Sequence, residues 1–149
     1  MIATATMAAN LESTYFVKNT GELTNCKQIL FRANDIKVVY ENGTAVFIPK
    51  NEVKAILLNN MYYEKLPVYK NNEKTGKEEF MQFVATRGGL KLFKYTGSLA
   101  HANGSKGFNV NGFTMDYYVV YKGDELWVEV TDVNYPTLFT FFGVKYNEA

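Results

Sequence analysis

Cysteine and histidine are almost missing from this chain of 149 residues, which contains one of each. The single cysteine, Cys26, can form no intramolecular disulfide and no cysteine-based zinc site, so we expect it to be a small buried side chain. The single histidine, His101, lies among small residues typical of a flexible loop, and it lacks the rigid partner that a catalytic base requires. The sequence therefore predicts no metal site, no cofactor, no catalytic residue and no enzyme activity.

Arginine, net charge and long apolar runs are also scarce. The formal net charge is +1, and only two of the 16 basic residues are arginine. The chain therefore has no overall electrostatic field to attract nucleic acid or an anionic membrane. It also has little arginine, the residue that binds phosphate and guanine through two hydrogen bonds. No run approaches the roughly 18 apolar residues that a membrane-spanning helix requires. We expect neither a nucleic-acid partner nor a membrane span.

Turn signals and aromatic residues are abundant. Eleven Tyr and eleven Phe suit the half-buried face of a strand better than a helix bundle. Short runs rich in Val, Ile, Phe and Tyr are separated by turn signals that contain Gly or Asn, which is typical of an antiparallel meander. The sequence predicts a mainly β protein with a single β domain over residues 14–149, whose meander closes into a barrel or a sandwich. The turn signals are Asn42-Gly43, Asn59-Asn60, Asn71-Asn72, Gly88-Gly89, Asn111-Gly112 and Gly123-Asp124.

Three local patterns give specific predictions. Asn42-Gly43 joins two strands, and we expect a two-residue type I′ turn because both residues tolerate positive φ. Residues 70–77 are charged and polar, which predicts a solvated hairpin loop and not a binding patch. Pro136 near a first turn and Gly143 after a last turn predict one short C-terminal helix over residues 136–142.

The last predicted hairpin carries the candidate binding residues. Strict alternation places Trp127 and Glu129 on one face of its second strand, opposite the apolar residues of that strand. Tyr118 and Asp116 lie on the polar face of the preceding strand. An aromatic pair, Trp127 with Tyr118, rimmed by carboxylates suits a sugar ring, whose C–H groups pack on aromatic faces. The alternative is that Trp127 is buried beneath the C-terminal segment. The apolar residues of the second strand are Leu126, Val128 and Val130.

Three classes of function stay open. The favoured one is a non-enzymatic structural or partner-binding domain, and the second is a carbohydrate-binding module, so the expected partner is a protein or a glycan. The third is a weak hydrolase that uses two carboxylates. Glu125 and Glu129, four residues apart on one strand, would lie roughly 13 Å apart, beyond the separation that glycosidases use. Asp116 with Glu129 stays open, although salt bridging is the favoured role for both. The sequence does not indicate an oligomeric state.

Two segments differ from the rest of the chain. Residues 1–13 are small and apolar before they become polar, like the end of a secretory signal peptide, with small residues such as Ala8 and Ala9 where a signal peptidase would cut. The alternative is a disordered N-terminus of a cytoplasmic protein or a virion component. The glycine-containing stretch 96–112 has few large apolar residues, and we expect it to be mobile.

Several strand-and-turn segments resemble those of small, largely uncharacterised exported β-rich proteins of Bacteroidetes-type bacteria. The resemblance covers most of the chain after Val38 and contains no chemical motif. It implies a secreted or periplasmic location and supplies no activity. The segments that carry it are residues 48–54, 63–68, 80–95 and 117–126.

Overall fold

A computed structural model describes residues 13–95, 108–110 and 113–145 of the chain. The signal-peptide prediction falls almost wholly on residues outside these ranges. The predicted mobility of stretch 96–112 and the role of His101 also concern residues outside them, apart from one short strand at 108–110.

The chain divides into two compact units. Unit 1 comprises Met1–Lys65 and unit 2 comprises Leu66–Ala149. The prediction of one β domain over residues 14–149 stays a prediction. In unit 1 the elements are β1 (Thr14–Lys18), β2 (Leu23–Cys26), β3 (Gln28–Phe31), β4 (Asp35–Val39), β5 (Ala45–Pro49), the 3-10 helix η1 (Lys50–Glu52) and β6 (Val53–Leu58). Strand β7 (Met61–Lys70) continues into unit 2, whose further described elements are β8 (Glu73–Arg87), β9 (Leu90–Tyr95), β10 (Phe108–Val110), β11 (Phe113–Met115), β12 (Tyr117–Lys122), β13 (Glu125–Glu129) and the helix α3 (Tyr135–Phe142).

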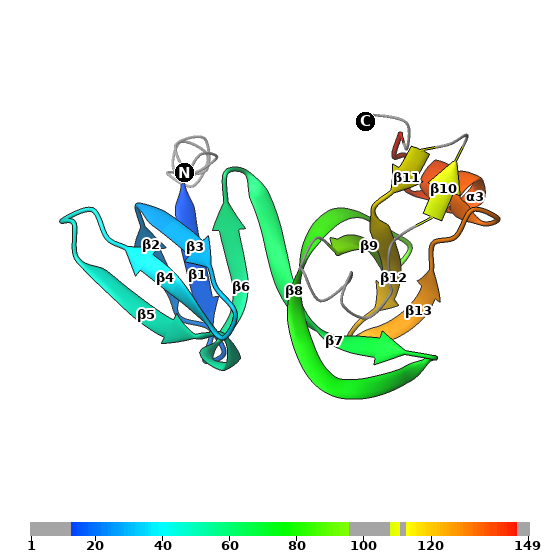
Figure 1. The fold of residues 1–149 in the computed structure, drawn as a ribbon. Helices are drawn as coiled ribbons and strands as arrows, with labels where there is room; N and C mark the ends of the chain where they lie inside the picture. Colours follow the sequence, from blue (N-terminus) through cyan, green and yellow to red (C-terminus); the bar gives the residue numbers. More distant parts are fainter. Residues whose placement is uncertain (1–12, 96–107, 111–112, 146–149) are drawn as a thin grey trace. The chain divides into compact units, whose positions relative to one another are not determined.

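The described strands form one large antiparallel sheet and two small ones (Figure 1). The large sheet has the order β13-β12-β9-β8-β7-β6-β1-β2, and the small sheets are β3-β4-β5 and β10-β11. Most neighbours in each sheet are also successive in sequence, which is the meander that the turn spacing predicts. The mainly β fold with one short C-terminal helix is therefore confirmed. The order of the described strands is open, with β13 and β2 at its ends, and no closed barrel is found among them.

Unit 1 buries apolar residues from both of its sheets. Cys26, 6% exposed, is one of them, which confirms the prediction of a buried thiol. Burial raises the pKa of the Cys26 thiol to about 11, and the nearby charge of Glu41 contributes. The other buried apolar residues of unit 1 are Phe16, Ile29, Ile36, Val38, Val53, Ala55 and Ile56.

The hairpin turns use positive φ angles, but the paired positive φ angles of a type I′ turn occur at the Asn-Asn turns and not at Asn42-Gly43. Asn59-Asn60 and Asn71-Asn72 have φ between 54° and 65°, as both central residues of a type I′ turn require. In Asn42-Gly43 only Gly43 has a positive φ, 89°. Tyr40 N–H donates to the Thr44 carbonyl at 2.8 Å, which leaves a three-residue loop. The prediction of a two-residue type I′ turn there is wrong, because the Asn42 side chain instead accepts a hydrogen bond from Thr44 N–H at 2.9 Å.

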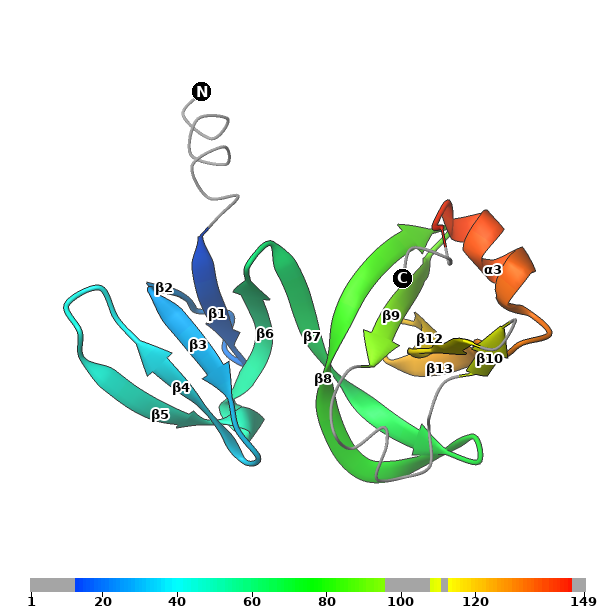
Figure 2. The same ribbon diagram turned by 45° about the horizontal axis from the view of Figure 1, so that its top comes forward.

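The sheet of unit 2 buries two separate clusters. We call the two faces the pocket face, which holds the pocket described below, and the helix face, which α3 covers. The buried residues of the pocket face are Leu66, Val68, Met81, Phe93, Tyr95, Val119 and Tyr121. The helix face carries Leu92 and Val120, together with Val130 and the α3 residues Phe139 and Phe142. Alternate residues of β9 and β12 therefore supply opposite cores. Figure 2 shows β8 bending along its length within this unit.

Helix α3 ends at Phe142, as the sequence predicts, and begins at Tyr135, one residue before the predicted start. A proline stands in its first turn, and Gly143 takes the left-handed conformation with φ 73° after its last residue. The N–H of Gly143 donates to the Thr140 carbonyl at 3.1 Å, and the N–H of Val144 donates to the Phe139 carbonyl at 2.9 Å. These bonds cap the C-terminal end of α3. The helix packs on the helix face, where Phe139 is only 1% exposed.

A β-bulge in β13 changes which residues share a face. Val128 pairs with Val120, but Leu126 pairs with Tyr121, so Trp127 is an extra residue between two regular pairs. Leu126 packs on the pocket face, while Val128 packs on the helix face. The prediction that Leu126, Val128 and Val130 share one face is therefore wrong, because one unpaired residue reverses the alternation.

Candidate functional site

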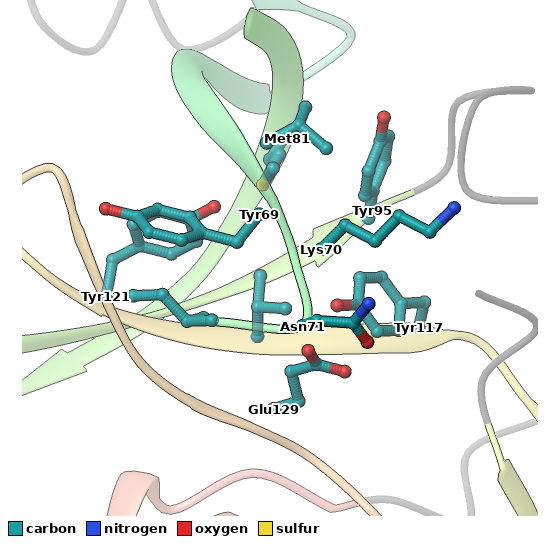
Figure 3. A pocket seen from close by; sticks show the side chains of 11 residues that line it. Tyr69, Lys70, Asn71, Met81, Tyr95, Tyr117, Tyr121 and Glu129 are labelled. Atoms are coloured by element: carbon teal, nitrogen blue, oxygen red, sulfur yellow. The ribbon is translucent and has the colours of Figure 1, made fainter. Parts of the chain in front are cut away.

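A pocket of about 170 Å³ lies on the pocket face of unit 2 (Figure 3). We call it the tyrosine pocket because four of its lining residues are tyrosines. Three polar residues and four apolar ones complete it, and all come from β7, β8, β9, β12, β13 and the turn after β7. The tyrosines are Tyr69, Tyr95, Tyr117 and Tyr121, the polar residues are Lys70, Asn71 and Glu129, and the apolar residues are Val68, Met81, Val119 and Leu126.

The floor of the tyrosine pocket is rigid because it belongs to the core. Met81 and Tyr121 are each 1% exposed. The Tyr121 hydroxyl donates a hydrogen bond to the Pro67 carbonyl at 2.6 Å, and the ring of Tyr69 packs edge-on against Tyr121 with centroids 6.1 Å apart. A ligand would therefore meet a preformed apolar and aromatic surface.

Glu129 supplies the carboxylate of the pocket, and both its side chain and its backbone carbonyl are held by hydrogen bonds. The Tyr117 hydroxyl is hydrogen-bonded to the Glu129 carboxylate. Burial raises the pKa of Tyr117, and the charge and hydrogen bond of Glu129 raise it further. The Asn134 side chain donates to the Glu129 carbonyl at 2.9 Å. In Figure 3 the carboxylate points toward the side chain of Asn71.

Lys70 and Asn71 stand at the mouth of the pocket, where β7 turns into β8. Both are exposed, and Asn71 has the positive φ, 54°, of a tight turn. The positive charge of Lys70 and the negative charge of Glu129 make the formal charge of the lining zero. The prediction of a loop over residues 70–77 is wrong in its extent, because only residues 71 and 72 form the turn and β8 begins at Glu73.

Tyr95 is also buried in the wall of the pocket, at 3% exposed. Its hydroxyl has no hydrogen-bond partner among the described residues. Burial raises the pKa of Tyr95, and the charge of Glu79 adds to the effect. The hydroxyl points away from Glu129 in Figure 3, so the ring of Tyr95 and not its hydroxyl forms the wall nearest the carboxylate.

Trp127, the main candidate from sequence, lies outside the tyrosine pocket. It is 58% exposed, so the alternative of burial beneath the C-terminal helix is wrong. The Lys122 ammonium lies over its ring, 5.7 Å from the centroid. The bulge explains the exposure, since Trp127 has no partner residue on β12 and so does not follow the alternation of its neighbours.

Tyr118 and Asp116 lie together, but they do not join Trp127 or Glu129 in one site. The Tyr118 ring packs edge-on against Phe139 of α3, with centroids 5.1 Å apart. Asp116 forms an ion pair with Lys94 at 3.0 Å. Burial raises the pKa of Tyr118, the Lys94 charge opposes this rise, and the Asp116 charge adds to it. Glu129 faces the opposite side of the sheet, in the tyrosine pocket.

Sequence reasoning missed most of the pocket. A signal was present in β12, where the alternation of Tyr117, Val119 and Tyr121 predicts that two tyrosines share a face, as they do. The tyrosines of β7 and β9 join them only through sheet order, which one sequence does not reveal.

Comparison with protein-family models, with curated proteins and with solved structures finds no match to this chain. Within the described residues, no group of three or more His, Cys, Asp or Glu could hold a metal ion. None of the helices in the described part of the chain is long and apolar enough to cross a membrane.

Proposed function

We propose that the protein is a non-enzymatic binding protein whose unit 2 holds a small, neutral, hydroxylated ring, such as a monosaccharide unit, in the tyrosine pocket. The observation that carries the proposal is the combination of aromatic walls with one carboxylate, one amide and one ammonium group. Aromatic faces suit the C–H face of a sugar, and the polar groups suit its hydroxyls. This keeps the carbohydrate hypothesis but moves the site from Trp127 to Glu129.

The charges of the lining favour a neutral ligand. A cation would be attracted by Glu129 and repelled by Lys70, and an anion would meet the opposite balance. A hydroxyl donates and accepts hydrogen bonds, so a polyol can satisfy both charged groups and the amide of Asn71 together.

The size of the pocket favours one ring. A cavity of about 150 Å³ in an engineered protein accepts benzene, and the tyrosine pocket has about 170 Å³. Sites for drug-sized ligands span roughly 300–1,000 Å³. A single six-membered ring at the end of a longer glycan therefore fits better than an extended ligand held along its length.

The arrangement of carboxylates supports a binding role over hydrolysis. Asp116 and Glu129, the pair that the sequence left open, lie on opposite faces of the sheet and have different partners, Lys94 and Tyr117. A glycosidase needs two carboxyl groups that flank one bond. The weak-hydrolase alternative would need a second carboxylate at the tyrosine pocket. Among the described residues of the lining, Glu129 is the one carboxylate.

Nuclear magnetic resonance titration with a panel of neutral monosaccharides tests the proposal. We expect weak binding, with a Kd on the order of 1 mM, and shifts of the backbone amides around Glu129, Asn71 and Tyr117. Glu129→Ala should abolish the shifts, whereas the control Trp127→Ala should keep them. Absence of binding by every sugar of the panel would refute the proposal, and loss of binding in Trp127→Ala alone would return the site to Trp127.

We also propose that the protein is exported to the periplasm or secreted. The support is the character of residues 1–13 and the resemblance to exported proteins, both of which come from sequence. The genomic DNA upstream of Met1 tests this. An earlier in-frame start followed by a basic and then an apolar stretch would agree with export, and Met1 retained in the cytoplasmic protein would contradict it.

A further inference from the structure

The Glu129 carboxylate has spare capacity to accept hydrogen bonds at the tyrosine pocket. A carboxylate offers about four lone-pair positions. Tyr117 occupies one, and Glu129 has no ion-pair partner among the described residues. Asp116, the residue just before β12, differs because it forms an ion pair with Lys94 at 3.0 Å. The Glu129 carboxylate is therefore a charged hydrogen-bond acceptor with lone-pair positions left for a ligand.

The position of this acceptor is fixed by the backbone and by two side chains. The bulge at Trp127 allows Leu126 and Glu129 to face the pocket together. Asn134 holds the Glu129 backbone through its carbonyl, and Tyr117 holds the carboxylate. Because the group is held in place before a ligand arrives, little side-chain entropy is lost when it accepts further hydrogen bonds.

We infer that Glu129 recognises two neighbouring hydroxyl groups of the ligand, one through each carboxylate oxygen, with Tyr117 as the positioning residue. This inference rests on the proposed function and names its ligand class, a six-membered ring that carries a vicinal diol. Two charge-assisted O–H···O⁻ bonds to one planar carboxylate match the spacing of adjacent hydroxyls. A ring with one hydroxyl satisfies one oxygen only and loses the second bond.

Cyclohexanol and 1,2-cyclohexanediol, in its cis and trans forms, are the probes. They share one ring and differ by one hydroxyl, and their binding to the full chain is measured by nuclear magnetic resonance titration. We expect the better diol isomer to bind about tenfold more tightly than cyclohexanol, because it gains one hydrogen bond to a charged group. Equal affinity of the three probes would overturn the inference.

Variants of Glu129 and Tyr117 separate recognition from structure. Glu129→Met removes both oxygens at nearly constant length, so the diol should lose two hydrogen bonds and cyclohexanol one, and the two probes should then bind with affinities within about twofold of each other. The matched control Glu125→Met, at an exposed position of the same strand, should keep the full preference. Tyr117→Phe should reduce the diol preference, because the carboxylate loses the group that positions it. If the preference survives Glu129→Met, another group recognises the diol and the inference fails.

The two proposals fail in different ways. If no probe and no monosaccharide of the panel binds the wild-type protein, the proposed function is refuted and the inference with it. If monosaccharides bind but diol and monoalcohol are not distinguished, only the assignment of Glu129 as a diol acceptor is refuted.

Discussion

The two faces of the sheet in unit 2 are built from the same strands and have opposite characters. The helix face is sealed by α3, and its buried residues are all apolar. The pocket face has aromatic residues with hydroxyls among its core, and Glu129 and Lys70 at its edge. In β12, Val120 serves the first face and Tyr121 the second, so one residue of register separates a sealed core from a pocket.

This difference teaches where a β protein can place a binding site. A face covered by a helix gains stability from apolar burial alone. The opposite face of a bent sheet is covered less completely, and tyrosines suit it because their rings pack while their hydroxyls reach polar partners. The four predictions below test this division between the faces, from the largest expected effect to the smallest.

Alkaline pH should break the pocket face and unfold unit 2. Burial raises the pKa values of Tyr95, Tyr117 and Tyr121 above the ordinary 10.0. The unfolded chain therefore loses these protons at lower pH than the folded protein does. Their contribution to stability is complete below about pH 10 and falls as the pH rises further. Circular dichroism and phenolate absorbance should show unfolding together with the ionisation of these tyrosines.

The opposite outcome is easy to recognise. If every tyrosine ionises near pH 10 while the circular dichroism stays that of the folded protein, the pocket-face hydroxyls are not buried. Glu129→Gln sharpens the test, because loss of the charge should lower the pKa of Tyr117 and leave that of Tyr95, whose neighbour is Glu79, unchanged.

Phe139→Ala should break the helix face. Phe139 is 1% exposed and packs against the rings of Tyr118 and Tyr135. We expect a loss of about 3–5 kcal/mol in the free energy of unfolding, because the substitution leaves a cavity in a sealed core. Urea denaturation measures it. The control Val133→Ala, at a residue that is 84% exposed, should change stability by less than about 0.5 kcal/mol. A loss below about 1 kcal/mol for Phe139→Ala would mean that α3 is not firmly docked.

The sequence predicts the helix face better than the pocket face, for physical reasons. Pro136 and Gly143 mark the ends of α3 because each has a backbone restriction or freedom that a helix end needs. Turn pairs such as Asn59-Asn60 locate the hairpins for the same reason. The confirmed predictions thus depend on local backbone preferences.

The bulge could not be predicted, and it decides the site. Trp127 differs from its neighbours in no way that marks it as unpaired, and strict alternation therefore groups Leu126 with Val128. The position of Glu129 beside Tyr117 then depends on register across two strands. Long-range register and sheet order come from the whole set of packing contacts, which a local pattern does not encode.

Tyr121→Phe should show that the hydroxyls of the pocket face have different roles. The Tyr121 hydroxyl donates to the Pro67 carbonyl at 2.6 Å, and its removal should cost about 1 kcal/mol in the free energy of unfolding. Tyr95→Phe is the matched control, because the Tyr95 hydroxyl has no partner among the described residues. Its removal should be neutral or slightly stabilising in urea denaturation. If Tyr95→Phe destabilises the protein as much as Tyr121→Phe, its hydroxyl has a structural role after all.

Trp127→Ala should have the smallest effect, because Trp127 belongs to neither face. Its ring is 58% exposed and contacts Lys122 through a cation–π interaction worth about 0.5–1 kcal/mol at most at such a site. We expect a stability change below about 1 kcal/mol. In the wild-type protein this single tryptophan should emit at long wavelength and be quenched readily by iodide, with unfolding changing its emission little. Emission at short wavelength that iodide does not quench would place Trp127 in a core. The bulge would then turn it inward, and the separation of the two faces at β13 would have to be redrawn.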